Sequence, residues 1–302
     1  MATAQFGRVI TAMITPFTED GAVDYESAVA LAKHLVAHGS EGLLVGGTTG
    51  EGATMTAEEK LKLYTLIVDA VGKRGEGKKV PVMGNIGTIS TADTIAFGNK
   101  AKETGIDCAL VIVPFYVKPN QEGMYQHFTA VAKGVDLGGR RIIKKKRNGV
   151  SIQPETIKRV VDECPNVVGI KDATGNWDQV TKEKALLPED FMIYSGDDAF
   201  TLPVLLAGGV GIISVSAHVI GDDMLAMVDA FEKGDLEKAR ELHLKMYEIN
   251  KGMFFTASPT PVKTATNLVG QPGGHFRLPM VEPTEAEKAK VRHMLENYGG
   301  LL

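Results

Sequence analysis

Short apolar runs alternate with longer amphipathic segments through the first two thirds of the chain, and this alternation restricts the fold more than any other feature. Runs of this kind predict buried parallel strands, and the segments between them predict the helices that cover such strands. Once a fifth strand near residues 140–144 is included, the pattern repeats eight times and predicts a (β/α)8 barrel. A doubly wound open sheet is the alternative, but no Gly-x-Gly-x-x-Gly motif opens a first helix.

Capping residues mark where several of these helices begin. Asp24 precedes a helical spacing of apolar residues, Thr56 and Glu59 form a capping-box pattern, and Pro154 stands at a first-turn position. Thr284 opens a second capping-box pattern near the C-terminus. The apolar runs place the expected strands at residues 9–14, 42–45, 80–83, 109–113, 140–144, 167–171, 191–194 and 211–215.

The last quarter of the chain differs from the rest, because only helical patterns remain from about Asp222 onward. We therefore expect a catalytic barrel domain at residues 1–222 and a C-terminal helical extension at residues 223–302. A length of 302 residues suits a single barrel that carries such an appendage. The extension is expected to pack on the barrel and not to form a separate functional module.

Charge and cysteine content exclude several classes of protein. The net charge is −4, from 33 basic and 37 acidic residues, so no basic excess points to nucleic acid as a partner. Cys108 and Cys164 are too few and too far apart for a disulfide framework or a cysteine-based zinc site. Neither a signal sequence nor an apolar run of membrane-spanning length occurs. We expect a soluble cytoplasmic protein without a membrane partner.

The run Val167-Val168-Gly169-Ile170-Lys171 reads as a buried strand that ends in a lysine. A buried ammonium is costly unless its pKa falls, and a desolvated neutral amine is the nucleophile that forms a Schiff base with a ketone. The active site of a barrel enzyme lies at the C-terminal ends of its strands, which is where Lys171 is expected. The alternative is a strand that has simply ended, with Lys171 in water.

Two further segments are expected at the same rim of the barrel. Glycines surround Thr48 and Thr49 after the second strand, and such a loop can turn its amides and hydroxyls toward a small carboxylate. Tyr116 follows the fourth strand and is a candidate proton carrier. The alternatives are a flexible turn for the loop and ordinary packing for the tyrosine.

No metal site is predicted. His34 and His38 lie four residues apart on a helix, but no third ligand or acidic partner stands in register, so a surface pair at a helix end is expected. Asp197 and Asp198 are interpreted as helix-capping residues.

Several motifs together resemble the dihydrodipicolinate synthase / N-acetylneuraminate lyase family, and the resemblance runs from about Phe6 to the C-terminus. They occur in the family's order: Gly47-Thr48-Thr49-Gly50-Glu51, Pro114-Phe115-Tyr116, Gln121-Glu122-Gly123-Met124-Tyr125-Gln126-His127-Phe128, Gly169-Ile170-Lys171-Asp172-Ala173, Ser195-Gly196-Asp197-Asp198 and Ser258-Pro259-Thr260-Pro261-Val262-Lys263. The synthase branch is the more similar one, because the lyases usually carry Ser where this chain has Thr48.

The resemblance implies that Lys171 forms a Schiff base with pyruvate and adds the resulting enamine to L-aspartate 4-semialdehyde, giving 4-hydroxy-tetrahydrodipicolinate for lysine and diaminopimelate biosynthesis. It implies that Thr48 and Thr49 hold the pyruvate carboxylate and relay a proton. It also implies that Tyr116 is lent across a subunit interface, so that the protein is at least a dimer and usually a tetramer. No cofactor is implied, since the lysine amine serves as the electron sink.

Other family residues are carried over with less support from the local pattern. The backbone around Gly196 and Ile213 is implied to line the pocket, and Arg147, aligned through Gly149, matches an arginine that binds the substrate carboxylate. A sibling aldolase that acts on a sugar acid is the alternative, and Arg147 argues against it because such lyases generally lack that arginine. Lysine feedback is not expected. Lysine-sensitive relatives carry two histidines and a tyrosine at the positions of Ala57, Lys60 and Phe115.

The region of the fifth strand departs from the family, because Ile142 stands where a tyrosine over the Schiff base belongs. Six charges in eight residues also suit a buried barrel strand poorly. Three interpretations of this stretch are open: residue assignments that are wrong there, a catalytically weakened or inactive pyruvate-binding relative, or a basic run that binds an acidic partner. Loss of one general acid–base group costs about a hundred- to ten-thousand-fold in rate.

Overall fold

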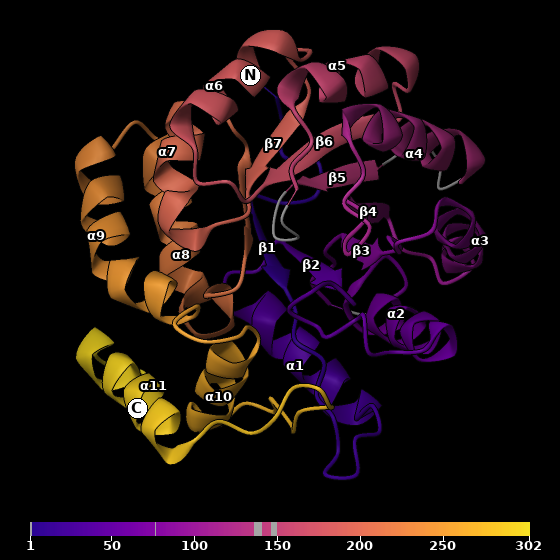
Figure 1. Cartoon of the computed structure of the whole chain (residues 1–302). Helices are drawn as coiled ribbons and strands as arrows, with labels where there is room; N and C mark the ends of the chain where they lie inside the picture. The colour runs from indigo at the N-terminus through magenta and orange to yellow at the C-terminus, as the bar shows by residue number, and fades with distance from the viewer. Residues whose placement is uncertain (1, 76, 136–140, 146–149) are drawn as a thin grey trace.

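A computed structural model describes residues 2–75, 77–135, 141–145 and 150–302, with the backbone alone for residues 141–145. Eight parallel strands pair in sequence order, and the eighth pairs with the first, so that the sheet closes into a barrel (Figure 1). The strands are β1 Val9–Ala12, β2 Gly42–Val45, β3 Val82–Asn85, β4 Cys108–Ile112, β5 Arg141–Lys145, β6 Val167–Asp172, β7 Met192–Ser195 and β8 Gly211–Ser214. The predicted (β/α)8 fold is confirmed.

Helices surround the barrel and follow its strands in turn (Figure 1). They are α1 Tyr25–Ala37, α2 Ala57–Val71, α3 Thr91–Lys102, α4 Gln121–Gly134, α5 Pro154–Glu163, α6 Trp177–Leu186, the 3₁₀ turn η1 Asp198–Phe200, α7 Thr201–Leu206 and α8 Ala217–Glu232. Within the described ranges, none of the helices combines the length and the apolar character that a membrane crossing requires.

The predicted helix starts are confirmed by hydrogen bonds. The Asp24 side chain accepts from the Ser27 amide at the start of α1. At the start of α2, Thr56 accepts from the Glu59 amide and the Glu59 carboxylate accepts from the Thr56 amide. These bonds satisfy amides that have no partner inside a first helical turn.

Strand β3 is displaced from the predicted residues 80–83. Pro81 has no amide hydrogen to donate to a ladder, and the strand instead begins one residue later. At its other end the strand includes Asn85, whose side-chain amide donates to the Gly46 carbonyl at 3.1 Å. A polar residue therefore extends this strand because the neighbouring loop supplies its partner.

Strand β5 forms in spite of its basic sequence. Its backbone pairs with β4 on one side and with β6 on the other, so both rows of its peptide groups have partners. Lys144 is the register partner of Lys171 in β6, and Ile142 is the register partner of Gly169. The expected fifth strand is therefore confirmed in the backbone.

Two apolar clusters make up the core. The larger one lies between the strands and the surrounding helices. The smaller one includes inward-facing residues of the strands and fills the barrel. Its buried members are Phe6, Ile10, Ala12, Leu44, Met83, Cys108, Leu110, Ile112, Met192, Tyr194, Val210 and Ile213. A filled interior leaves the ends of the strands as the place where polar chemistry can be built.

The C-terminal extension packs on one side of the barrel. It consists of α9 Leu236–Gly252, α10 Thr260–Leu268 and α11 Glu285–Tyr298 (Figure 1). Helix α11 contacts both α9 and α10, and the extension reaches the barrel through α8, η1 and α7. The expected domain boundary at residue 222 falls inside α8, just after a kink at Ile220. The division into two domains stays a prediction.

A buried histidine joins the first strand to the eighth helix. His218 lies in the first turn of α8, where its Nε2 accepts from the Ile14 amide at 3.1 Å and its Nδ1 donates to the Val215 carbonyl at 2.8 Å. Both ring nitrogens are therefore engaged in the neutral form. Burial lowers the pKa of His218 to about 4, because the charged imidazolium loses its hydration inside the protein.

Stability is therefore expected to fall with acid. The unfolded histidine has a pKa of about 6.5, so His218 adds stability at pH 7, and that contribution decreases as pH falls from 6.5 toward 4. The loss at pH 4 is about 3 kcal/mol for this residue. Chemical denaturation of wild type and of His218→Gln across this range measures the difference in slope. The exposed control His293→Gln should follow wild type, and parallel profiles for wild type and His218→Gln would contradict the assignment.

Candidate active site

Lys171 lies near the C-terminal end of β6 and is only 6% exposed. Its register partners are Lys144 in β5 and Tyr194 in β7. The alternative of an exposed lysine beyond the end of a strand is therefore wrong. The chain holds this amine inside the mouth of the barrel, where water cannot surround it.

A small cavity brings Lys171 together with three other predicted site residues, Thr48, Thr49 and Gly196. These residues come from loops and strands far apart in the sequence, and they meet because parallel strands end at one rim. Apolar side chains complete the enclosure. The lining residues are Ala12, Leu44, Thr48, Thr49, Leu110, Lys171, Ala173, Gly196, Val215 and Phe254.

Glycine is the residue type that fits at position 196, beside Lys171. A Cβ atom at this position would lie 3.0 Å from Cε of Lys171 and 2.7 Å from Cβ of Ala173. Its amide donates to the carbonyl of Asp172, which fixes the backbone close to the lysine stem. A side chain at position 196 would therefore force Ala173 to move and crowd the stem of Lys171.

The loop after β2 is a closed turn that presents the two threonines. The Gly52 amide donates to the Gly47 carbonyl at 3.0 Å, and the Glu51 amide donates to the Thr48 carbonyl at 3.1 Å. Gly46 turns into the loop at φ +66°, and a Cβ there would lie 2.6 Å from the Tyr64 hydroxyl oxygen. Internal hydrogen bonds and close packing hold this segment, which favours a binding loop over the alternative of a flexible turn.

A buried carboxylate joins the loops that follow β7 and β8. Asp198 accepts from the Ser214 hydroxyl and from the amides of Val215 and Ser216. Burial raises its pKa while these hydrogen bonds oppose the rise. Asp197 caps η1 through the Ala199 amide, as expected, whereas Asp198 instead fixes the backbone around Val215, which lines the cavity.

The remaining predicted site residues lie elsewhere. Tyr116 is 88% exposed, has a φ of +64°, and does not line the cavity. Ile213 belongs to the apolar interior of the barrel, and Val215 contacts the cavity in its place. Arg147 lies outside the described residues.

Phe254 was not predicted as a site residue. It follows α9 in the C-terminal extension and closes one side of the cavity. No local pattern distinguishes it from neighbouring apolar residues such as Phe255, because its role depends on how the extension folds back onto the barrel. The extension is therefore part of the site.

The histidine pair at the end of α1 has an acidic partner, whereas none was expected from the sequence. Nδ1 of His38 lies 3.0 Å from a carboxylate oxygen of Asp222 in α8, far away in the sequence. His34 stacks against His38 with ring centroids 4.4 Å apart. In the described part of the chain no group of three histidine, cysteine or acidic residues is arranged to hold a metal ion.

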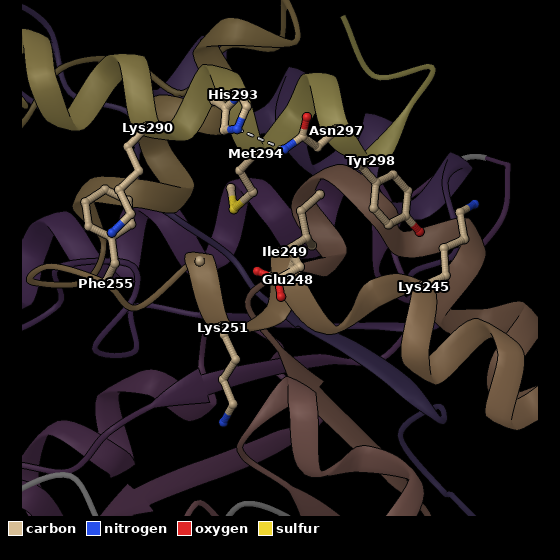
Figure 2. A pocket seen from close by; sticks show the side chains of 11 residues that line it. Lys245, Glu248, Ile249, Lys251, Phe255, Lys290, His293, Met294, Asn297 and Tyr298 are labelled. Carbon is tan, nitrogen blue, oxygen red and sulfur yellow. Dashed lines mark hydrogen bonds between the residues drawn. The ribbon is translucent and has the colours of Figure 1, made fainter.

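A larger cavity of about 510 Å³ lies between α9 and α11, but it contains none of the predicted site residues (Figure 2). Its lysines already have partners. Lys245 bonds Asp223 at 2.7 Å, and the Lys290 amine lies over the Phe255 ring at 4.3 Å from the centroid. We therefore place the chemistry in the smaller cavity around Lys171.

The smaller cavity is suited to carbonyl chemistry on a small anionic substrate. A buried primary amine can attack a carbonyl carbon, and two adjacent hydroxyls can bind a carboxylate and transfer a proton. Apolar walls from Leu44, Leu110 and Phe254 keep water away from a hydrolysable imine. At about 20 Å³ the cavity has no room for a bulky substrate.

Comparison with known proteins agrees with this geometry. The sequence model of the Dihydrodipicolinate synthetase family matches residues 5–298. A 4-hydroxy-tetrahydrodipicolinate synthase of Heliobacterium modesticaldum is 45% identical over 295 residues, which cover 98% of this chain and 96% of the relative. The crystal structure of dihydrodipicolinate synthase from Bacillus anthracis has a TM-score of 0.91 at 40% identity and covers 98% of this chain and 99% of its own. The enzyme from Acinetobacter baumannii, solved with pyruvate, has a TM-score of 0.91 at 32% identity, with 98% and 99% coverage.

Proposed function

Since the chain belongs to the dihydrodipicolinate synthetase family, we propose that the cavity around Lys171 condenses pyruvate with L-aspartate 4-semialdehyde to give 4-hydroxy-tetrahydrodipicolinate. The observation that carries the proposal is the convergence of Lys171, Thr48, Thr49 and Gly196 on one enclosed space. The reaction is that of a Schiff-base-forming lyase in lysine and diaminopimelate biosynthesis, and the expected compartment is the cytoplasm. Because the lysine itself activates pyruvate, the proposal includes no cofactor.

The reaction begins with the amine of Lys171. Its nitrogen attacks C2 of pyruvate, and loss of water leaves an imine. Removal of a proton from the pyruvate methyl group gives an enamine, whose carbon then attacks the aldehyde of L-aspartate 4-semialdehyde. The amino group of that substrate finally attacks the imine carbon, which closes the ring and returns Lys171 as the free amine.

The two threonines are assigned different tasks. Thr49 is buried and Thr48 is exposed, although both line the cavity. We assign both to the pyruvate carboxylate and assign Thr49 also to proton transfer, because it is held at the inner side of the loop. Arg147 is proposed to bind the carboxylate of the second substrate.

The exposure of Tyr116 supports an enzyme of more than one subunit. Tyr116 is 88% exposed, lies beside the exposed Val117 and does not reach the cavity of its own chain. Its φ lies in the left-handed region, where the backbone turns sharply. We propose that Tyr116 completes the proton relay of a second copy, in a dimer or a tetramer. The site is then incomplete in a single chain.

Complementation between two inactive variants is the expected consequence of this arrangement. Tyr116→Phe chains keep Lys171, and Lys171→Ala chains keep Tyr116, so a mixed dimer holds one intact site. Random pairing after co-refolding returns about a quarter of wild-type activity, because half of the dimers are mixed and each has one working site of two. Activity in the enzyme assay and mass by light scattering are the measurements. No recovery in a mixture shown to exchange chains would contradict sharing of the tyrosine.

The proposed function is tested by the mass of the intact protein after incubation with pyruvate and borohydride. Reduction converts the imine to a stable amine, so the protein gains the mass of one pyruvate-derived group. Peptide mapping should place this group on Lys171. Formation of the cyclic product from both substrates then completes the test.

A further inference from the structure

We propose that Lys263 and Glu51 form a positioning pair, through which the C-terminal extension holds the threonine loop in its catalytic geometry. This inference rests on the proposed function. Lys263 comes from α10, and Glu51 lies in the turn that carries Thr48 and Thr49. Neither residue lines the cavity around Lys171, so neither is a catalytic residue.

The two charges are among the most deeply buried in the protein. The Lys263 side chain is 0% exposed, the Glu51 side chain is 2% exposed, and their nearest charged atoms are 2.7 Å apart. The Lys263 ammonium also donates to the His275 carbonyl. It lies over the rings of Phe17 and Phe276, at 4.6 and 4.9 Å from their centroids. The ammonium is therefore fixed from several sides.

The ion pair holds the side chain of Glu51 in place, and the backbone of Glu51 in turn holds the threonine loop. Its φ of +51° lies in the left-handed region, which is unusual for a residue with a side chain and must be stabilised by its surroundings. Its amide donates to the Thr48 carbonyl, and its carbonyl accepts from the Thr54 amide and hydroxyl. Movement of the carboxylate would therefore change the turn that presents the threonines.

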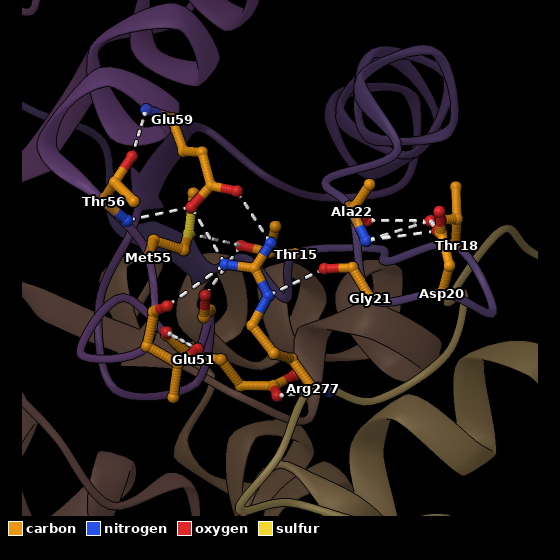
Figure 3. A network of polar contacts seen from close by, with 12 residues as sticks. Thr15, Thr18, Asp20, Gly21, Ala22, Glu51, Met55, Thr56, Glu59 and Arg277 are labelled. Carbon is orange, nitrogen blue, oxygen red and sulfur yellow. Dashed lines mark hydrogen bonds and ion pairs between the residues drawn. The ribbon is translucent and has the colours of Figure 1, made fainter.

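The segment between α10 and α11 contacts the same turn through Arg277. Arg277 donates to the carbonyls of Gly21 and Thr54 and forms two bonds with Glu59 (Figure 3). The backbone amide of Arg277 lies 3.4 Å from the second carboxylate oxygen of Glu51. Both oxygens of Glu51 therefore face the C-terminal segment. The turn is enclosed between α2 and that segment.

Stability alone does not explain a buried ion pair at this place. Desolvation of two charges offsets most of their attraction, and an apolar pair of similar size is often as stable. Hydrogen bonds fix the distance and the angle between their groups, whereas an apolar contact fixes neither. A positioning function predicts that removal of both charges alters kinetics in a protein that still folds.

The decisive variant is Lys263→Met/Glu51→Gln, which removes both charges without leaving one unpaired. Displacement of a positioning loop by about 1 Å lowers reaction rates about a hundred-fold. We expect the rate of borohydride trapping with pyruvate to fall ten- to a hundred-fold, with a higher KM for pyruvate, at temperatures where circular dichroism shows the native fold. Trapping at the wild-type rate in the folded variant would overturn the inference.

A control at a less buried ion pair tests whether any lost ion pair has this effect. Arg8 and Glu41 pair outside the site, where Arg8 also bonds Asp229 and Glu232, and Arg8→Met/Glu41→Gln removes these contacts. This control should lower the melting temperature and leave trapping unchanged. If Lys263→Met/Glu51→Gln does not fold, Glu51→Asp alone serves as the test, since it keeps the buried ion pair but withdraws the carboxylate from Lys263 by one methylene. It should show the same change in KM at smaller size, and wild-type kinetics would again reject the inference.

The two proposals fail in different ways. Wild-type protein that gives no pyruvate adduct would reject the proposed function. Wild-type protein that gives an adduct on Lys171, together with folded variants that trap as fast, would reject the positioning pair alone.

Discussion

Lys171→Ala should give no pyruvate adduct and lose activity by about 10⁴- to 10⁶-fold, the range seen when a central member of a catalytic group is removed. The reason is that, among the side chains that the structure describes, no other one lining the cavity is a primary amine. The cavity wall should otherwise persist, because Lys171 contributes little apolar area to the barrel interior. Intact mass after borohydride treatment and a steady-state assay measure the two effects.

Two other lysines, the half-buried Lys60 and the buried Lys263, make this prediction specific. Burial lowers the pKa of Lys60 and of Lys263, so both satisfy the simplest requirement for a reactive amine. Lys60 lies in a neighbouring cavity, however, and Lys263 is bonded to Glu51. Lys60→Ala is the matched control and should keep the adduct. An adduct that persists in Lys171→Ala would show that burial, and not position in the barrel mouth, selects the lysine.

Ile142→Tyr should raise kcat by about a hundred- to ten-thousand-fold, which is the contribution of one general acid–base group. Position 142 of β5 pairs with Gly169, and Gly169 lies two residues before Lys171 on the same face of β6. The family resemblance places its tyrosine at this position, so this chain is expected to turn over slowly. The measurement is kcat with both substrates at saturation.

The hydroxyl group itself is tested by Ile142→Phe, which has the ring of tyrosine but carries no proton. Equal rates for Ile142→Phe and Ile142→Tyr would show that ring packing and not proton transfer limits this enzyme. A wild-type rate in both variants would show that another residue supplies the proton.

The fold could be predicted because its signals are local. Apolar runs, capping residues such as Thr56, and a proline at the start of α5 each act within a few residues of the chain. The predicted strand boundaries are less accurate where a residue distant in the sequence determines the end of a strand. Asn85 is an example, because its bond to Gly46 extends β3. Strand β5 forms because both neighbours offer backbone partners, which overrides its unsuitable composition.

The candidate site was predicted in part for the same reason. Lys171 lies near the end of β6 and the two threonines lie in the loop after β2, and a barrel brings all strand ends to one rim. Phe254 and Lys263 could not be assigned in this way, since neither follows a strand. Their positions depend on the packing of α9 and α10 against the barrel, which no local pattern reports.

The bond between Lys263 and Glu51 joins positions 212 residues apart, and this separation has a consequence for synthesis of the protein. A ribosome completes all eight strands by Ser214, well before it adds the lysine that anchors the threonine loop. The growing chain therefore holds every strand of the barrel while its pyruvate site is still unfinished. A stop codon between β8 and position 263 would yield a protein with Lys171 present and the threonine loop without its Lys263 anchor.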